Sequence, residues 1–294
     1  MSAVAGASTV VVKLGGAATA VPAELAELIA DVGDQVAAGG RVVIVHGGGA
    51  EVSAVSERLG LRPQVIDGVR QTTAEEMDVV DMVLCGLVNK RVVRACAAAQ
   101  MAAVGVCGSD GGLFAVQPLA LNGGSSAASH TGEVVAVDPA LIHHLLDAGY
   151  VPVVASPAHL APDVPMNINA DAAALELAPA LSAQSLLFLS DVAGVLRDGE
   201  PLPALTPENA EAEIAGQTIT GGMIPKVRAA VGAVARGVGR VVVGSYQGRG
   251  TLQRMMAGRQ GTTIHATGAT DTTDTTVATS AITGNGAQQR GGAT

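Results

Sequence analysis

The stretch VVVKLGGAAT, residues 10–19, joins three valines, a lysine and a pair of glycines. A run of β-branched residues is typical of a buried strand, and the glycines that follow indicate a tight turn. A charged side chain in such a strand is costly unless an anion pairs with it. Lys13 is also one of only three lysines in the chain, against fourteen arginines. The sequence therefore predicts a functional role for Lys13 at the end of the first strand.

The same alternation of a short apolar run and an Ala- and Leu-rich segment recurs along the chain. Buried strands are expected at residues 9–15, 41–47, 102–108, 150–156, 185–191 and 239–245. Helices are expected at residues 22–39, 74–100, 138–149, 170–183 and 222–237, with a further one starting near residue 50. Two hairpins are expected, at residues 61–71 and at 111–117 paired with 132–138. Continuous apolar strands joined by helices predict an α/β fold, an αβα sandwich with a mainly parallel central sheet.

Composition narrows the classes of function. The chain has 294 residues, 48% of them apolar, a net charge of −9 and no tryptophan. Without a basic run or an aromatic platform, a nucleic-acid partner is not expected, and no apolar stretch reaches the ~20 residues that span a bilayer. Cys85, Cys96 and Cys107 lack metal-ligand spacing, so reduced thiols and a cytoplasmic location are expected. Residues 1–266 are expected to form a single domain, and 267–294 a disordered tail.

Two glycine-rich turns each join a strand to the helix that follows. Gly15-Gly16 ends the first strand, and Gly47-Gly48-Gly49 ends the second. Glycine lets bare backbone N–H groups face an anion at a helix N-terminus, although either turn alone could equally be only a tight turn. Neither run completes G-x-G-x-x-G, and no G-x-x-x-x-G-K-[ST] occurs, which argues against a dinucleotide-binding Rossmann enzyme and a P-loop NTPase. Turns on neighbouring strands still suggest a phosphate path between them.

Further polar residues lie where later strands and helices meet. Asn169 and Asp171 open a helix, as an N-cap and a helix-dipole partner would, but this leaves Asn167 unexplained. In the functional alternative, the Asn amides hold a substrate carboxylate and Asp171 orients nearby lysines. Lys226 lies near the start of another helix, where the dipole disfavours a cation unless an anion is shared there. Arg70 is either a fork for a carboxylate or a solvated surface arginine.

The remaining candidates carry less chemistry. Lys90 is expected to be solvated or to face another subunit. His46 is expected to be oriented by packing or a backbone contact rather than to be catalytic, and His143 and His144 do not have the i, i+4 spacing of a metal pair. No Ser/His/Asp or Cys/His arrangement and no zinc spacing is evident, so no protein metal site is expected.

Seven motifs together resemble the signatures of the amino acid kinase family, and within it the branch that phosphorylates N-acetylglutamate. In chain order they are KLGG (13–16), HGGG (46–49), GVRQTT (68–73), GLVNKRVV (86–93), MNINAD (166–171), LSDVAGVL (189–196) and TGGMIPKV (220–227). The resemblance runs from about residue 9 to 264 and implies an open αβα sandwich. It also implies two lobes, of which about 8–182 would bind the acyl amino acid and dimerise and about 183–266 would bind ATP.

The resemblance assigns roles to individual residues. Lys13 and Lys226 would stabilise the transferring phosphoryl group, and Asp171 would orient both lysines. The residues implied to bind the substrate are Gly47, Gly48, Arg70 and Asn167. The residues implied to bind ATP with Mg²⁺ are Gly15, Gly16, Ser190, Asp191, Gly222 and Met223.

The implied activity is transfer of the ATP γ-phosphoryl group to the side-chain carboxylate of N-acetyl-L-glutamate, in arginine biosynthesis. That carboxylate is ionised at pH 7 because its pKa is ~4.3, so no general base is needed. Bringing two anions together would then rest on positioning, Mg²⁺ and fixed positive charge.

The chain departs from the family pattern in places. Ala50 stands where relatives often have Pro, and Gln71 where many have Val. The short N-terminus lacks the extra amphipathic helix of arginine-inhibited hexameric relatives, so a homodimer without arginine feedback is expected.

Two alternatives remain open: a kinase for aminoadipate or glutamate attached to a carrier protein, and a non-catalytic regulatory relative. The short segment 61–73, with a single Arg near the motif, favours the free acetylated amino acid over the carrier, and retention of both lysines and Asp171 argues against a silent relative. Carbamate and aspartate kinases fit the motif around Lys226 less well.

Overall fold

A computed structural model describes residues 8–66, 69–120 and 129–266 of the chain. Its main sheet has eight strands in the order β14-β16-β15-β11-β1-β2-β8-β5. Their bounds are β1 Thr9–Leu14, β2 Arg41–His46, β5 Ala103–Cys107, β8 Val151–Ala155, β11 Ser185–Ser190, β14 Ala204–Leu205, β15 Arg240–Ser245 and β16 Thr262–His265. Neighbours pair in parallel except β15 with β16. The predicted mainly parallel sheet and all six predicted strands are confirmed.

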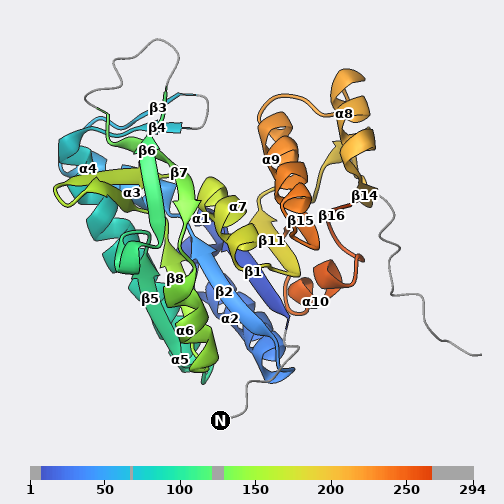
Figure 1. The fold of residues 1–294 in the computed structure, drawn as a ribbon, viewed down its shortest axis with the longest axis horizontal. Helices are drawn as coiled ribbons and strands as arrows, with labels where there is room; N and C mark the ends of the chain where they lie inside the picture. Colours follow the sequence, from blue (N-terminus) through green and yellow to red (C-terminus); the bar gives the residue numbers. More distant parts are fainter. Residues whose placement is uncertain (1–7, 67–68, 121–128, 267–294) are drawn as a thin grey trace, which may run out of the picture.

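Helices cover both faces of this sheet (Figure 1) because alternate strand residues point to opposite sides. Val10 and Val12 of β1 belong to one apolar cluster, together with residues of α2 (Pro22–Ala37), α5 (Asn89–Ala98) and α10 (Thr251–Met256). Val11 belongs to the other cluster, whose helices are α6 (Ala140–Asp147), α7 (Ala170–Ala180), α8 (Pro207–Ala215) and α9 (Met223–Ala235). Two buried faces on one strand make the αβα sandwich.

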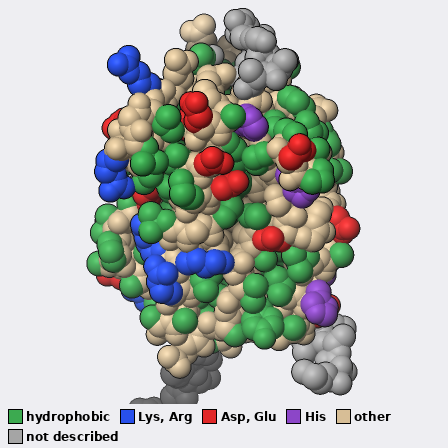
Figure 2. Space-filling view, turned by 90° about the vertical axis from the view of Figure 1, so that its left-hand side faces the viewer, with side chains coloured by type: hydrophobic (Ala, Val, Ile, Leu, Met, Phe, Trp, Pro, Cys, Tyr) green, Lys and Arg blue, Asp and Glu red, His purple; other side chains and the backbone are tan. Residues whose placement is uncertain are grey.

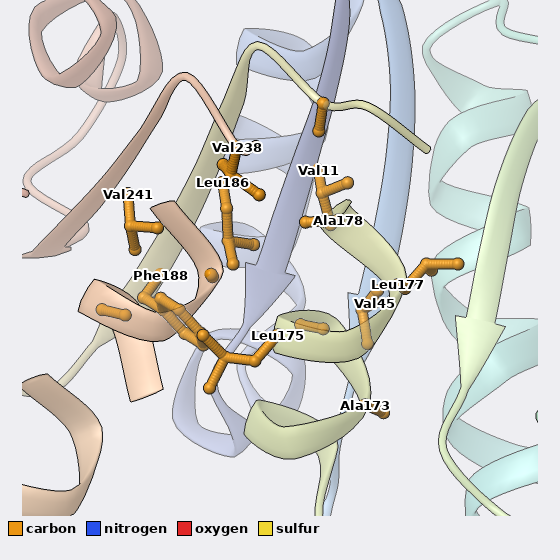
Figure 3. Packing of buried hydrophobic residues seen from close by; sticks show 14 of the residues in the cluster. Val11, Val45, Ala173, Leu175, Leu177, Ala178, Leu186, Phe188, Val238 and Val241 are labelled. Carbon is orange, nitrogen blue, oxygen red and sulfur yellow. The ribbon is translucent and has the colours of Figure 1, made fainter. Parts of the chain in front are cut away.

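The packing under α7 fixes the position of the helix that carries Asp171. Figure 3 shows Val11 of β1, Leu186 and Phe188 of β11 and Val45 of β2 beside Leu175 and Ala178 of α7. All six side chains are buried. Asn169 caps the start of α7, since its Oδ1 accepts hydrogen bonds from the backbone N–H groups of Asp171 and Ala172. The N-cap interpretation of Asn169 is therefore confirmed.

Smaller sheets lie beyond the carboxyl ends of the main strands. A four-stranded sheet has the order β6-β7-β10-β9, with bounds β6 Phe114–Pro118, β7 Thr131–Val137, β9 Ala158–Ala161 and β10 Val164–Ile168. Two short antiparallel pairs are β3 Gln64–Ile66 with β4 Val69–Gln71, and β12 Leu196–Arg197 with β13 Glu200–Pro201. Both predicted hairpins are confirmed, β3–β4 and β6–β7, whereas β9 and β10 were not predicted.

Most helices follow the prediction. The segment expected as one helix over 74–100 is α4 (Ala74–Asp81), a π-helical turn η1 (Met82–Val88) and α5 in succession. The glycine turns lead into α1 (Gly16–Ala20) and α3 (Gly49–Arg58). Helices α8 and α10 were not predicted. The predicted disordered tail, 267–294, lies outside the described residues.

The surface gives two further observations. Figure 2 shows the side of the molecule that carries α4 and α5, where acidic, basic and apolar side chains are interspersed. Within the described residues, no helix is both long and apolar enough to cross a membrane.

Candidate active site

Three charged side chains from distant parts of the chain meet at the carboxyl edge of the sheet. Lys13 lies near the end of β1, Asp171 in the first turn of α7 and Lys226 in the first turns of α9. The Nζ of Lys13 lies 2.5 Å from Oδ1 of Asp171, and the Nζ of Lys226 lies 3.3 Å from its Oδ2. One carboxylate thus bridges two ammonium groups, as the family resemblance implied.

This bridge leaves positive charge in excess. Burial raises the pKa of Asp171, but the charges and hydrogen bonds of Lys13 and Lys226 lower it by more than burial raises it. The pKa of Asp171 therefore lies below its usual value. Asp171 is therefore ionised at neutral pH and balances one of the two lysines. The Nζ of Lys226 also lies 5.9 Å from the centre of the Phe188 ring, close enough for a cation–π contact. An incoming anion would meet one uncompensated cation at this point.

A cavity of about 660 Å³ is lined in part by Lys13. Its walls include the predicted substrate residues Gly47, Gly48, Arg70 and Asn167, together with Asp171. Apolar side chains complete it; among them are Val52, Val65, Val69, Val80, Leu84 and Leu119. The structure therefore brings together all four residues predicted to bind the substrate.

Arg70 is held in this wall rather than solvated. Its Nη1 donates to Oε1 of buried Glu76 at 2.5 Å. Its Nη2 donates to the carbonyl oxygen of Gly49 at 2.9 Å and to Oγ of Ser53 at 2.5 Å. A guanidinium has five N–H donors, so these bonds fix its plane and leave donors for an anion. Glu76 and Ser53 were not singled out from the sequence.

Asn167 lines the same cavity from β10, in a strand rather than at a helix mouth. Its Nδ2 donates to Oγ1 of Thr72 at 2.9 Å. The backbone N–H of Thr72 donates to Oγ1 of Thr131, which in turn donates to the carbonyl oxygen of Arg70. A chain of hydrogen bonds thus connects the Asn167 side chain to the backbone carbonyl of Arg70, and Thr72 and Thr131 were not singled out from the sequence.

A second cavity, of about 310 Å³, shares Lys13 and Gly16 with the first. Its walls are Lys13, Gly15, Gly16, Ala18, Leu189, Ser190, Asp191, Lys226 and Tyr246. The predicted ATP residues Gly15, Gly16, Ser190 and Asp191 are therefore together. Gly222 and Met223 are not in these walls, because they form the start of α9 one turn before Lys226, and Met223 packs on the apolar core.

Close backbone approach explains the glycines. The N–H of Gly15 donates to the carbonyl oxygen of Leu189 at 3.0 Å, and a Cβ on Gly15 would lie 2.9 Å from that oxygen. Gly48 has φ +155°, where a Cβ would lie 2.9 Å from Cδ2 of Leu84. A Cβ on Gly16 would lie 3.9 Å from Cα of Gly48, so the two turns are neighbours. The N–H groups of the first turn of α3 have no partner inside the helix, which suits an anion.

His46 has a structural place. Its Nε2 faces Nδ2 of Asn89 at 3.1 Å, and its Nδ1 lies 3.0 Å from the carbonyl oxygen of Gly47. Since an amide NH₂ can only donate, Nε2 accepts and Nδ1–H donates to Gly47. The pKa of His46 is lowered to about 4, mainly by burial. The hydrogen bond to the backbone of Gly47 opposes this decrease in pKa, and the charge of Lys90 adds to the decrease. His46 is thus neutral with both ring nitrogens engaged, as the prediction of an oriented, non-catalytic histidine requires.

Lys13 and Gly16 line both cavities. Two ligands, one in each cavity, could therefore both reach Lys13, with a transferring group between them. We call the place where the two cavities meet, at Lys13 and Gly16, the crossing. The donors there suit a polyphosphate: two ammonium groups, glycine backbone and the start of α3. No group of three or more His, Cys, Asp or Glu within the described residues could hold a metal ion. A Mg²⁺ that stays bound to phosphate oxygens and waters needs no such cage.

Comparison with known proteins agrees with this geometry. The model of the amino acid kinase family matches residues 8–245. The acetylglutamate kinase of Acaryochloris marina is 44% identical over 234 residues, 78% of this chain and 81% of that protein. The acetylglutamate kinase of Rubrobacter xylanophilus is 42% identical over 263 residues, 89% of this chain and 98% of that protein. The crystal structure of smu.665 from Streptococcus mutans superposes with a TM-score of 0.72 at 29% identity, covering 87% of this chain and 98% of the other. The chain belongs to the amino acid kinase family.

Proposed function

We propose that this chain transfers the γ-phosphoryl group of ATP to the side-chain carboxylate of N-acetyl-L-glutamate, in arginine biosynthesis. The observation that carries the proposal is the meeting of two cavities at Lys13 and Gly16, with Lys226 and Asp171 beside them. The activity named for relatives above 40% identity over most of the chain supports the choice of substrate.

The larger cavity would take the acyl amino acid. Arg70, held in plane by Glu76, and Asn167 would bind its α-carboxylate, and the apolar wall would face its acetyl methyl group. Its side-chain carboxylate would then point to Lys13 and the turn at Gly47 and Gly48. Because this group is already ionised, no general base is required, which agrees with the engaged nitrogens of His46.

The smaller cavity would take the phosphates of ATP. A carboxylate oxygen attacks the γ-phosphorus, the bond to the β,γ-bridging oxygen breaks, and ADP leaves with that bond's electron pair. Lys13 and Lys226 would neutralise the charge on the transferring group, and Asp171 would hold both at the right separation. Mg²⁺, when bound with ATP, would neutralise further phosphate charge. Gly15 would act through its close approach to Leu189, since its N–H is already bonded there.

The roles of the two lobes, the oligomeric state and the cellular location belong to the same proposal. The part up to about residue 182 would bind the acyl amino acid and form a homodimer, and the part from about 183 to 266 would bind ATP. The enzyme would act in the cytoplasm. Sedimentation of the purified chain tests the dimer, since a monomer at micromolar concentration would contradict it.

The first experiment measures ADP release from Mg-ATP with hydroxylamine present to trap an acyl phosphate. N-acetyl-L-glutamate, free L-glutamate and N-acetyl-L-aminoadipate are compared at equal concentration. We expect strong hydroxamate formation with N-acetyl-L-glutamate alone. Turnover with none of the three would contradict the proposal and point to a carrier-bound substrate or a non-catalytic regulatory protein.

A further inference from the structure

Arg91 lies in the wall of neither cavity, yet it bonds to both helices that start at the crossing. From α5, its Nη1 donates to the carbonyl oxygen of Thr19 in α1 at 2.8 Å. The same nitrogen donates to Oε1 of Glu51 in the first turn of α3 at 2.9 Å. Helix α1 follows the Gly15–Gly16 turn, and α3 follows Gly48. One side chain from a third helix therefore ties the two glycine turns together.

Neither turn is fixed by a cap of its own. The N-cap positions are Gly15 for α1 and Gly48 for α3, and neither supplies a side-chain hydrogen bond to its helix. A cap of that kind is worth ~1 kcal/mol in other helices. Helix α1 has only five residues, too few to be stable alone. Other bonds hold each helix start separately, Gly15 to Leu189 and Gly49 to Arg70, whereas the bonds from Arg91 link α1 and α3 to each other.

The contacts of Thr19 and Glu51 connect Arg91 to the two glycine turns. Thr19 is fully buried and its Oγ1 donates to the carbonyl oxygen of Gly16 at 2.9 Å. The side chains of Arg91 and Glu51 are only 26% and 16% exposed, so solvent screens their pairing less than at the surface. Oε2 of Glu51 is buried without a hydrogen-bond partner and would lie 3.6 Å from a Cβ on Gly48. Without Arg91, this carboxylate would stand uncompensated beside the Gly48 turn.

We infer that Arg91 is a positioning residue, which holds the Gly15–Gly16 and Gly47–Gly49 turns at the separation that phosphoryl transfer requires. The structural part follows from the bonds themselves, while the kinetic consequence rests on the proposed function. Arg91 touches no ligand in this scheme; it acts through Thr19 and Glu51. A displacement of about 1 Å at a reacting centre can cost on the order of a hundredfold in rate.

The test uses Arg91→Met in the full chain, with Arg41→Met as a matched control. Arg41 has a similar exposure, 28%, and pairs with Asp147 at 2.6 Å, but it lies at the opposite, amino end of β2. The first readout is backbone amide hydrogen exchange of peptides covering 14–20 and 47–54, without ligands. We expect exchange in both peptides to be about tenfold faster or more in Arg91→Met and unchanged in Arg41→Met.

The second readout is kinetic. With N-acetyl-L-glutamate and Mg-ATP, kcat should fall by about tenfold or more in Arg91→Met and stay within twofold of wild type in Arg41→Met. Glu51→Gln, a milder change that keeps the side-chain shape, should speed exchange in the 47–54 peptide, and it serves if Arg91→Met does not fold. Unchanged exchange, or an unchanged kcat in an active enzyme, would overturn the inference. An inactive wild type would instead contradict the proposed function, and the exchange result would still decide the role of Arg91.

Discussion

At the scale of single residues, Lys13 is the position whose chemistry matters most, because it lines both cavities. We expect Lys13→Arg to lower kcat for hydroxamate formation by about a hundredfold or more. A guanidinium is wide and planar, and its fork would compete for Asp171 and fill the crossing. Thermal unfolding should show a fold that remains intact.

Lys90→Arg provides the matched control for that substitution. Its Nζ donates to Oδ1 of Asn89 and to the carbonyl oxygen of Gly105, away from both cavities. Its kcat should remain within twofold of wild type. Equal activity of the two variants would contradict a need for a compact cation at Lys13.

The residues at the crossing were predictable where their type conflicted with their local context. A lysine in a valine run and a lysine near a helix start both suggested an anion, and both meet Asp171. Glu76 gave a weaker signal, although it follows Arg70 by six positions and buries its carboxylate against it. Tyr246 gave none, since a tyrosine after an apolar strand is ordinary and its place in the second cavity depends on the sheet order.

At the scale of elements, His46 joins three of them: it ends β2, bonds Asn89 at the start of α5, and Asn89 donates onward to the carbonyl oxygen of Val153 in β8. The pKa of His46 is about 6.5 in the unfolded chain, and burial lowers this pKa to about 4 in the folded chain. The stability from neutral His46 is therefore complete above pH 6.5 and is lost as pH falls to about 4. The loss is on the order of 3 kcal/mol.

Urea unfolding at pH 7, 6, 5 and 4 measures this loss. We expect His46→Gln to be less stable than wild type at pH 7 but to lose less stability between pH 6.5 and 4. His144→Gln, at an exposed position on α6, should keep the wild-type slope. Parallel curves for wild type and His46→Gln would show that His46 does not carry the pH dependence.

The elements that were predicted have local signals, and most of the missed ones do not. Continuous apolar runs gave every strand in the centre of the main sheet. Helix α8 did have a signal, because Thr206 and Asn209 form a capping box before its apolar residues. Helix α10 had none: its start is capped by Asp31 of α2, which accepts hydrogen bonds from the backbone N–H groups of Gly250 and Leu252. A cap that comes from more than 200 residues away cannot be found from neighbours in sequence.

At the scale of the whole molecule, the main sheet runs without a break through both proposed lobes. Val11 and Val43 from one part share an apolar cluster with Val241 and Ile264 from the other. We therefore expect one cooperative urea transition rather than two. Without tryptophan, tyrosine fluorescence of a Tyr150→Phe variant reports Tyr246 alone, and far-UV circular dichroism reports the whole. The two midpoints should coincide, and separated transitions would contradict shared cooperativity.

The shared wall of Lys13 and Gly16 also has a consequence for how ligands arrive. Apart from Lys13 and Gly16, the two cavities have different lining residues. We expect that either substrate can bind first, so initial-rate plots should show a random sequential mechanism. A single molecule that joins an acylated glutamate to an adenosine polyphosphate would occupy both cavities at once. Such a compound would make the contacts of both ligands while losing the translational and rotational entropy of only one molecule.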